Sequence, residues 1–85
     1  MDMELKNWLS SGKYRIEVLK ILGRKPSIPS DIAKELQIHR SSITRILNDL
    51  VDEGIISRTN KSAKTTTYFL TKKGENTIKE IGEEK

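Results

Sequence analysis

The sequence predicts a small, mainly α-helical domain that carries one β-hairpin, and two patterns indicate it. Before residue 55, apolar residues recur at the spacing of amphipathic helices. After it, residues 55–59 and 65–70 are rich in β-branched and aromatic side chains. The polar stretch 60–64 between these two runs is typical of a hairpin loop. With 85 residues in all, the chain has room for one limited core.

The first two predicted helices are short and amphipathic. Residues 2–10 form a segment whose apolar side needs another surface to cover it. Ser10 or Ser11 is a suitable N-cap for a second helix, which ends near Gly23. The apolar side of the first helix consists of Leu5, Trp8 and Leu9, and that of the second includes Tyr14, Val18, Ile21 and Leu22.

A helix-turn-helix motif is predicted for residues 29–53. Pro29 suits the first position of a helix, where its missing N–H costs nothing, and this helix ends near Leu36. After a short turn, residues 40–53 carry a continuous apolar stripe, and Gly54 follows where a C-cap belongs. The stripe consists of Ile43, Ile46, Leu47, Leu50 and Val51. Two such helices joined by about three residues are typical of a helix-turn-helix.

The opposite face of residues 40–53 has a chemistry suited to DNA. Arg40 lies in the first turn, and the face continues with Ser41, Thr44, Arg45 and Asn48. Arginine can bind guanine in bidentate fashion and asparagine can do the same at adenine, so Arg45 and Asn48 are the preferred base readers. Arg40 is best placed for the phosphate backbone. An ordinary solvated helix face is the alternative interpretation.

The distribution of charge favours a polyanionic partner. The net charge is +4, but residues 12–73 hold thirteen basic and six acidic side chains, a net charge of +7. Both ends of the chain are mildly acidic. A basic body of this kind suits a nucleic acid, and a merely soluble, lysine-rich surface is the alternative.

Composition argues against several other classes of function. The chain has no cysteine, and His39 lacks carboxylate partners at metal-ligand spacing, so we expect neither a metal nor another cofactor. It has no Gly-rich phosphate loop and no nucleophile–base pair with an orienting group, so we do not expect an enzyme. No apolar run approaches the roughly 20 residues that span a bilayer, and the acidic start lacks a signal-peptide pattern. We therefore expect a cytoplasmic protein without membrane contact.

The chain is expected to have three parts. Residues 1–11 form a helix for packing or dimerisation, residues 12–71 form the DNA-binding domain, and residues 72–85 form a C-terminal helix capped by Thr71. Leftover apolar faces at both ends motivate a homodimer. These faces are Leu5, Trp8 and Leu9 at one end and Ile78 and Ile81 at the other.

The order helix, short strand, helix, turn, helix and basic hairpin is that of a winged helix-turn-helix domain. In residues 32–47, 50–56 and 68–74 the chain resembles the prokaryotic, archaeal-type winged-helix transcription regulators of the MarR and ArsR type. Two positions depart from their pattern. Members often have glycine where this chain has Gln37, and serine or threonine where it has His39. The N-cap of the recognition helix therefore either shifts to Ser41 or is weaker.

The resemblance implies a regulator of transcription that binds double-stranded DNA as a homodimer. It assigns DNA reading to Ser41, Ser42, Thr44, Arg45 and Asn48. It also implies a wing over residues 57–66, on which Arg58, Lys61 and Lys64 grip phosphate or the minor groove. Ser30 is a minor phosphate candidate, because helix N-termini attract anions.

A winged-helix module for protein–protein contact in a larger complex, without direct DNA reading, is the alternative function. Such domains usually need no basic recognition face, which this chain has. The sequence does not indicate an operator or a small-molecule effector, and an effector would need a pocket at the dimer interface.

Overall fold

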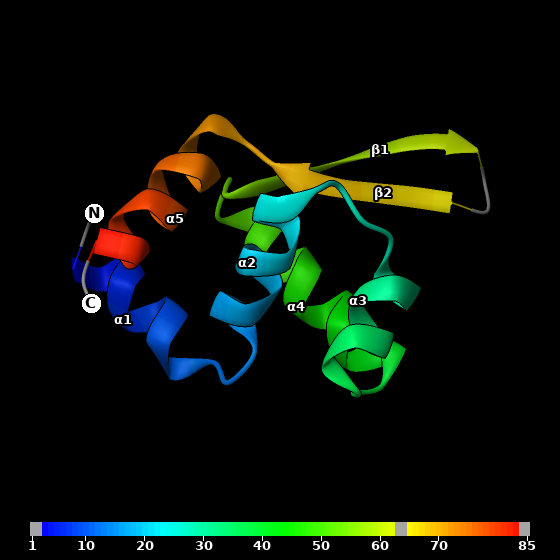
Figure 1. Cartoon of the computed structure of the whole chain (residues 1–85), viewed down its shortest axis with the longest axis horizontal. Helices are drawn as coiled ribbons and strands as arrows, with labels where there is room; N and C mark the ends of the chain where they lie inside the picture. Colours follow the sequence, from blue (N-terminus) through cyan, green and yellow to red (C-terminus); the bar gives the residue numbers. More distant parts are fainter. Residues whose placement is uncertain (1–2, 63–64, 84–85) are drawn as a thin grey trace.

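The computed structural model describes residues 3–62 and 65–83, which form five helices and one antiparallel hairpin (Figure 1). The elements are α1 (Met3–Ser11), α2 (Arg15–Arg24), α3 (Pro29–Leu36), α4 (Arg40–Asp52), β1 (Ile56–Ser62), β2 (Thr65–Leu70) and α5 (Lys72–Glu83). This arrangement confirms the predicted fold class, a mainly helical winged helix-turn-helix with an extra helix at each end.

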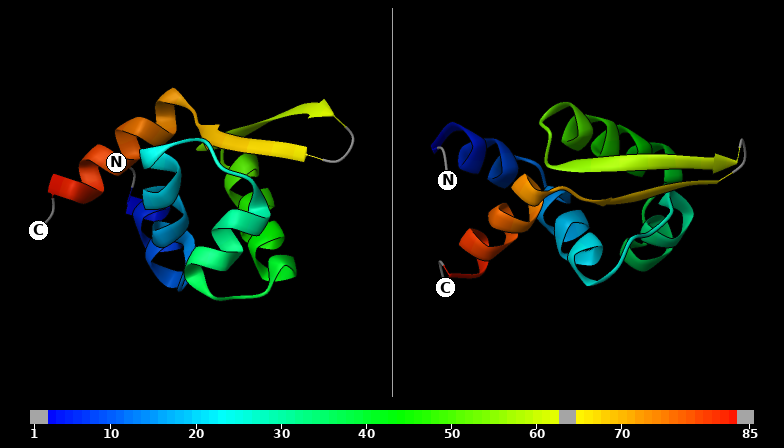
Figure 2. Two further views of the ribbon diagram at one scale, coloured as in Figure 1. Left: turned by 45° about the vertical axis from the view of Figure 1, so that its right-hand side comes forward. Right: turned by 90° about the horizontal axis from the view of Figure 1, so that it is seen from above.

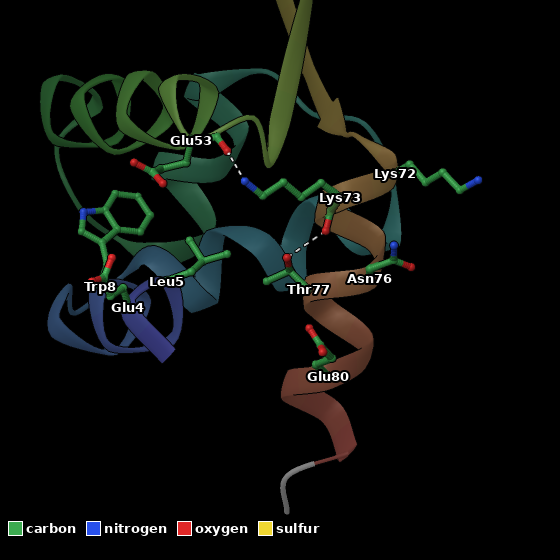
Figure 3. A pocket seen from close by; sticks show the side chains of 9 residues that line it. All are labelled: Glu4, Leu5, Trp8, Glu53, Lys72, Lys73, Asn76, Thr77 and Glu80. Atoms are coloured by element: carbon green, nitrogen blue, oxygen red, sulfur yellow. Dashed lines mark hydrogen bonds between the residues drawn. The ribbon is translucent and has the colours of Figure 1, made fainter. Parts of the chain in front are cut away.

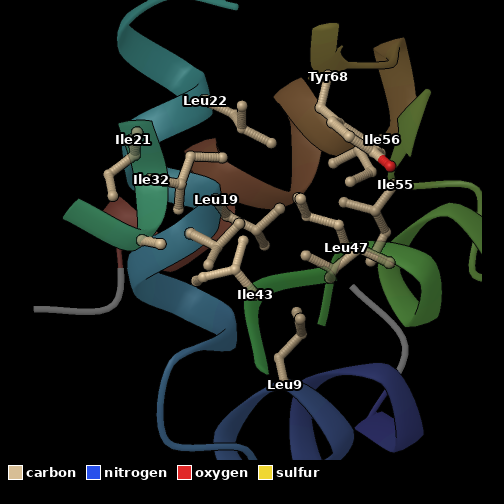
Figure 4. Close-up of a cluster of buried hydrophobic side chains, with 13 residues drawn as sticks. Leu9, Leu19, Ile21, Leu22, Ile32, Ile43, Leu47, Ile55, Ile56 and Tyr68 are labelled. Atoms are coloured by element: carbon tan, nitrogen blue, oxygen red, sulfur yellow. The ribbon is translucent and has the colours of Figure 1, made fainter. Parts of the chain in front are cut away.

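The core lies where α2, α3, α4 and the base of the hairpin meet (Figure 4). Its fully buried members include Leu19 of α2, Ile32 of α3, Ile43 and Leu47 of α4, and Ile55. Burying one such side chain stabilises the fold by about 1.5–3 kcal/mol. The predicted apolar stripe of α4 is therefore the part of that helix that packs inward.

The expectation that α1 has an uncovered apolar face for dimerisation is wrong at Leu9. Only 1% of its surface is exposed, because it enters the core of its own domain (Figure 4). Leu5 and Trp8 are partly buried and pack against the same core. Of the three residues predicted for an interface, Leu9 is thus unavailable to a second chain.

The predicted start of α2 was wrong, and its predicted end was early by one residue. Ser11 is the last residue of α1, and its hydroxyl donates to the Trp8 carbonyl at 2.8 Å, so it does not cap the next helix. Helix α2 begins only at Arg15, whose guanidinium lies 4.1 Å from the Trp8 ring centroid and donates to the Trp8 carbonyl. Gly23 lies inside α2, which ends at Arg24. The contact between Arg15 and Trp8 joins two helices, so residue patterns within each helix do not reveal it.

The hairpin is longer than predicted. Strand β1 continues to Ser62 instead of ending near residue 59, because the ladder extends through the pairs Asn60↔Thr66 and Ser62↔Thr65, with an irregularity between them. The short strand expected before the helix-turn-helix is confirmed at Ser27, which exchanges two backbone hydrogen bonds with Tyr68 at 3.0 and 2.8 Å. The wing is thereby tied to the segment that precedes α3.

A close backbone approach joins the start of α5 to the loop after α4. The Gly74 N–H donates to the Thr71 hydroxyl oxygen at 3.2 Å, which confirms Thr71 as the cap of α5. The Thr71 hydroxyl lies 2.7 Å from the Gly54 carbonyl and 2.9 Å from that of Ile55. A Cβ added to Gly74 would lie 2.1 Å from the Ile55 carbonyl oxygen. Glycine is therefore required at position 74.

Gly74→Ala should destabilise the domain by about 1–3 kcal/mol, since the new methyl group must displace backbone. Gly23→Ala is the matched control, because its Cβ would meet Ile78 at an ordinary 3.5 Å inside a helix. There alanine should be neutral or stabilising by up to about 1 kcal/mol. Urea unfolding of the two variants measures both effects, and equal stabilities would contradict this account of the joint.

Candidate nucleic-acid interface

The predicted reading residues form one exposed face of α4. Arg40, Ser41, Ser42, Thr44, Arg45 and Asn48 are all exposed. Helix α4 has 13 residues, and because Ile43, Leu47 and Leu50 are fully buried, the residues on the opposite side of the helix point outward. Its acidic residues Asp49 and Asp52 come only in the C-terminal part. The front of the face therefore combines hydrogen-bonding groups and positive charge.

The start of α4 shows whether its N-cap has shifted to Ser41 or is a weaker cap at His39. Helix α4 begins at Arg40, and His39 occupies the N-cap position with φ −65° and ψ 141° but without a side-chain cap. The cap has therefore not moved to Ser41, and it is the weaker one. Just before it, Gln37 has a left-handed backbone with φ 58° and ψ 43°, a conformation that favours glycine, so the glycine that the resemblance led us to expect here has a structural reason.

Thr44 uses its hydroxyl hydrogen within the helix. Its Oγ1 donates to the Arg40 carbonyl at 3.0 Å. The oxygen keeps its acceptor capacity, so towards a ligand Thr44 offers an acceptor while this bond is made. A phosphate group has no hydrogen to donate to the Thr44 oxygen, whereas the amino groups of bases can donate to it.

Arg58 joins the wing to α4, which the sequence did not predict. Its Nη1 donates to Asn48 Oδ1 at 3.3 Å, and both side chains are exposed. Arg58 is paired with Tyr68 in the hairpin and lies two residues after the buried Ile56, on the same face of the sheet. Figure 2 shows β1 running alongside α4 in the right-hand view. The alternation from Ile56 was the signal that could have revealed this orientation.

The remaining predicted contacts are distributed over other elements. Ser30 is exposed at the second position of α3. Lys61 belongs to β1, but its side chain is not described, and Lys64 lies outside the described residues.

The opposite end of the molecule holds a cleft that the sequence did not predict (Figure 3). It has a volume of about 740 Å³ and is lined by residues of α1 and α5 and by Glu53, including Leu5, Trp8, Lys72, Lys73 and Thr77. Lys73 Nζ donates to the Glu53 carbonyl at 2.9 Å, so the wall of the cleft is bonded to the end of α4.

In the described ranges, His, Asp and Glu side chains form no group of three that could hold a metal ion. Within the same ranges, no helix has the length and apolar character needed to cross a membrane.

Residues 5–83 match the family described as the HVO_A0261 N-terminal domain. The chain belongs to this family. A relative from Methanocaldococcus jannaschii, the uncharacterized protein MJ0944, is 43% identical over 63 residues, which cover 69% of this chain and 52% of that protein. The chain thus spans about half the length of the curated relative that it matches.

Solved structures confirm the winged-helix fold. RosR of H. salinarum is similar with a TM-score of 0.80 at 22% identity, covering 85% of this chain and 71% of that chain. FabT of Streptococcus pneumoniae, solved in complex with DNA, is similar with a TM-score of 0.76 at 25% identity, covering 85% of this chain and 52% of that chain. Assignment to the MarR or ArsR type stays a prediction.

Replacement of His39 tests the cap of α4. His39→Ser should stabilise the domain by roughly 0.5–2 kcal/mol relative to His39→Ala, because a serine hydroxyl can accept a backbone N–H of the first turn. The backbone at residue 39 already has the extended conformation of an N-cap. Thermal unfolding of the two variants gives the difference, and a serine variant no more stable than the alanine variant would contradict the assigned helix start.

Proposed function

We propose that this chain binds double-stranded DNA in a sequence-specific manner and regulates transcription. The single observation that carries the proposal is the exposed face of α4, where arginines and short hydrogen-bonding side chains point away from the core. FabT, which has a similar fold and was solved in complex with DNA, supports it. In a prokaryote such a regulator works in the cytoplasm, on the chromosome.

The dimensions of α4 suit the major groove of DNA. A helix with its side chains is roughly 10–12 Å across, and the groove is about 12 Å wide. With its 13 residues, α4 is about 20 Å long, enough for its first turns to meet base edges. In this pose Arg45 and Asn48 read bases, and Thr44 accepts from a base amino group. Ser41 and Ser42 contact bases or phosphate, and Arg40 binds the backbone. The wing, residues 57–66, then lies against phosphate or the minor groove.

We also propose a homodimer formed through α1 and α5. These helices lie at the end of the molecule away from the wing (Figure 1). Met3 is 70% exposed, and Leu5, Trp8, Ile78 and Ile81 are only partly buried. A two-fold dimer would place two copies of α4 about 34 Å apart, one turn of DNA, on a palindromic site.

Light scattering over a concentration series tests the dimer. We expect the mass of two chains at high concentration, since apolar surface on α1 and α5 would be buried between copies. Met3→Glu should weaken association, because it places a charge in this surface, whereas Gln37→Glu, at an exposed position in the turn between α3 and α4, is the charge-matched control. A strict monomer at high concentration would rule the dimer out.

A mobility-shift assay on duplex DNA with a salt series tests DNA binding itself. If about four cations contact phosphate, the slope of log K against log salt concentration should be near −3.6. A chain that serves only protein contact should bind no duplex at any salt concentration.

Two single substitutions should separate base reading from backbone contact. Arg45→Ala should reduce the preference for the bound sequence by roughly 1–3 kcal/mol, because a bidentate base contact is lost. Lys61→Ala should weaken all sequences about equally and make the salt slope shallower by about 1. Competition assays with specific and random duplexes measure both, and wild-type behaviour of both variants would contradict the groove-reading pose.

A further inference from the structure

The contact between Arg58 and Asn48 constrains how Asn48 can meet a base. A guanidinium has only donors, so the atom of the Asn48 amide that lies 3.3 Å from Arg58 Nη1 has to be the oxygen. The amide NH₂ group is thereby turned away from Arg58. The orientation of this amide follows from the chemistry of its neighbour and not from a free choice between two rotamers.

Buried residues fix the backbone on both sides of the contact between Arg58 and Asn48. Ile56, two residues earlier on the same face of β1, is 1% exposed and fixes the base of the strand in the core. Tyr68, the partner of Arg58 across the hairpin, is 5% exposed and is bonded through its backbone to Ser27. On the other side, Leu47, the neighbour of Asn48, is fully buried. Both ends of the contact are therefore held by buried residues.

This contact changes which base Asn48 can bind best. An asparagine that reads adenine accepts from the N6 amino group through Oδ1 and donates to N7 through Nδ2. Here Oδ1 accepts from Arg58, and although its second lone pair stays open, the positively charged guanidinium beside it opposes the approach of another donor such as the adenine N6 amino group. The guanidinium and the amide NH₂ both supply donors, so they suit guanine, which presents the acceptors O6 and N7 in the major groove, better than adenine, which presents one acceptor and one donor.

We propose that Arg58 and Asn48 act together as a donor pair that favours guanine where Asn48 alone would favour adenine. The proposal rests on the proposed function, with α4 in the major groove. It gives Arg58 a role in specificity, in contrast to the non-specific phosphate contact expected of a wing cation.

Selection of bound duplexes from a random pool tests the pair, using wild type, Arg58→Ala, Asn48→Ala and the double variant. The position read by Asn48 is the one whose preference is lost in Asn48→Ala. At that position wild type should select guanine, and Arg58→Ala should shift the preference towards adenine by about tenfold, because the cationic donor that opposes N6 beside Oδ1 is removed. The double variant should behave like Asn48→Ala alone, since the two residues act through one contact.

Arg40→Ala is the control for loss of a cation, and it should weaken all selected sequences about equally. Arg58→Met, which keeps the aliphatic stem without donors, should reproduce the shift of Arg58→Ala. Circular dichroism of each variant verifies the fold, which should persist because Arg58 and Asn48 are exposed.

A wild type that prefers adenine at this position would overturn the donor pair. So would an Arg58→Ala variant that weakens every sequence to the same extent, as Arg40→Ala should, and either result would leave DNA binding intact. Absence of any selected duplex with wild type would instead refute the proposed function, and the donor pair with it.

Discussion

Burial of one side of α4 is the constraint on which the rest of this structure depends. Ile43, Leu47 and Leu50 are each fully buried, and together they hold the helix in one rotation about its axis. If each contributes about 1.5–3 kcal/mol, a rotation that exposed all three would cost about 4.5–9 kcal/mol, which is comparable with the roughly 5–15 kcal/mol stability of a typical small domain. The polar face is therefore directed outward by the same packing that stabilises the fold.

The end of α4 is held as firmly as its side. The loop after it runs through Gly54, with a positive φ of 77°, into the buried Ile55, whose carbonyl meets Gly74 without room for a side chain. Lys73 adds a bond to the Glu53 carbonyl. Because these contacts join α4 to α5, the proposed DNA face and the proposed dimer helices belong to one connected structure.

Features governed by local pattern could be predicted from the sequence, and features governed by contacts between elements could not. The stripe of α4, the start of α3 at Pro29 and the cap at Thr71 depend on neighbouring residues, and all three were predicted. Helix α2 starts late, at the residue whose side chain contacts Trp8 of the preceding helix, and the length of β1 depends on its partner strand. The exposed face of α4 could be predicted, but the contact between Arg58 and Asn48 requires the position of the wing relative to the helix.

Methylation interference with dimethyl sulfate tests the central claim most directly, because the reagent marks guanine N7 in the major groove and adenine N3 in the minor groove. If α4 enters the major groove, N7 methylation at guanines within each half-site should prevent binding of the wild-type chain. Methylation of adenine N3 should interfere only in the flanking sequence that the wing contacts. Binding that tolerates N7 methylation throughout the site would contradict the assignment of α4 as the reading helix.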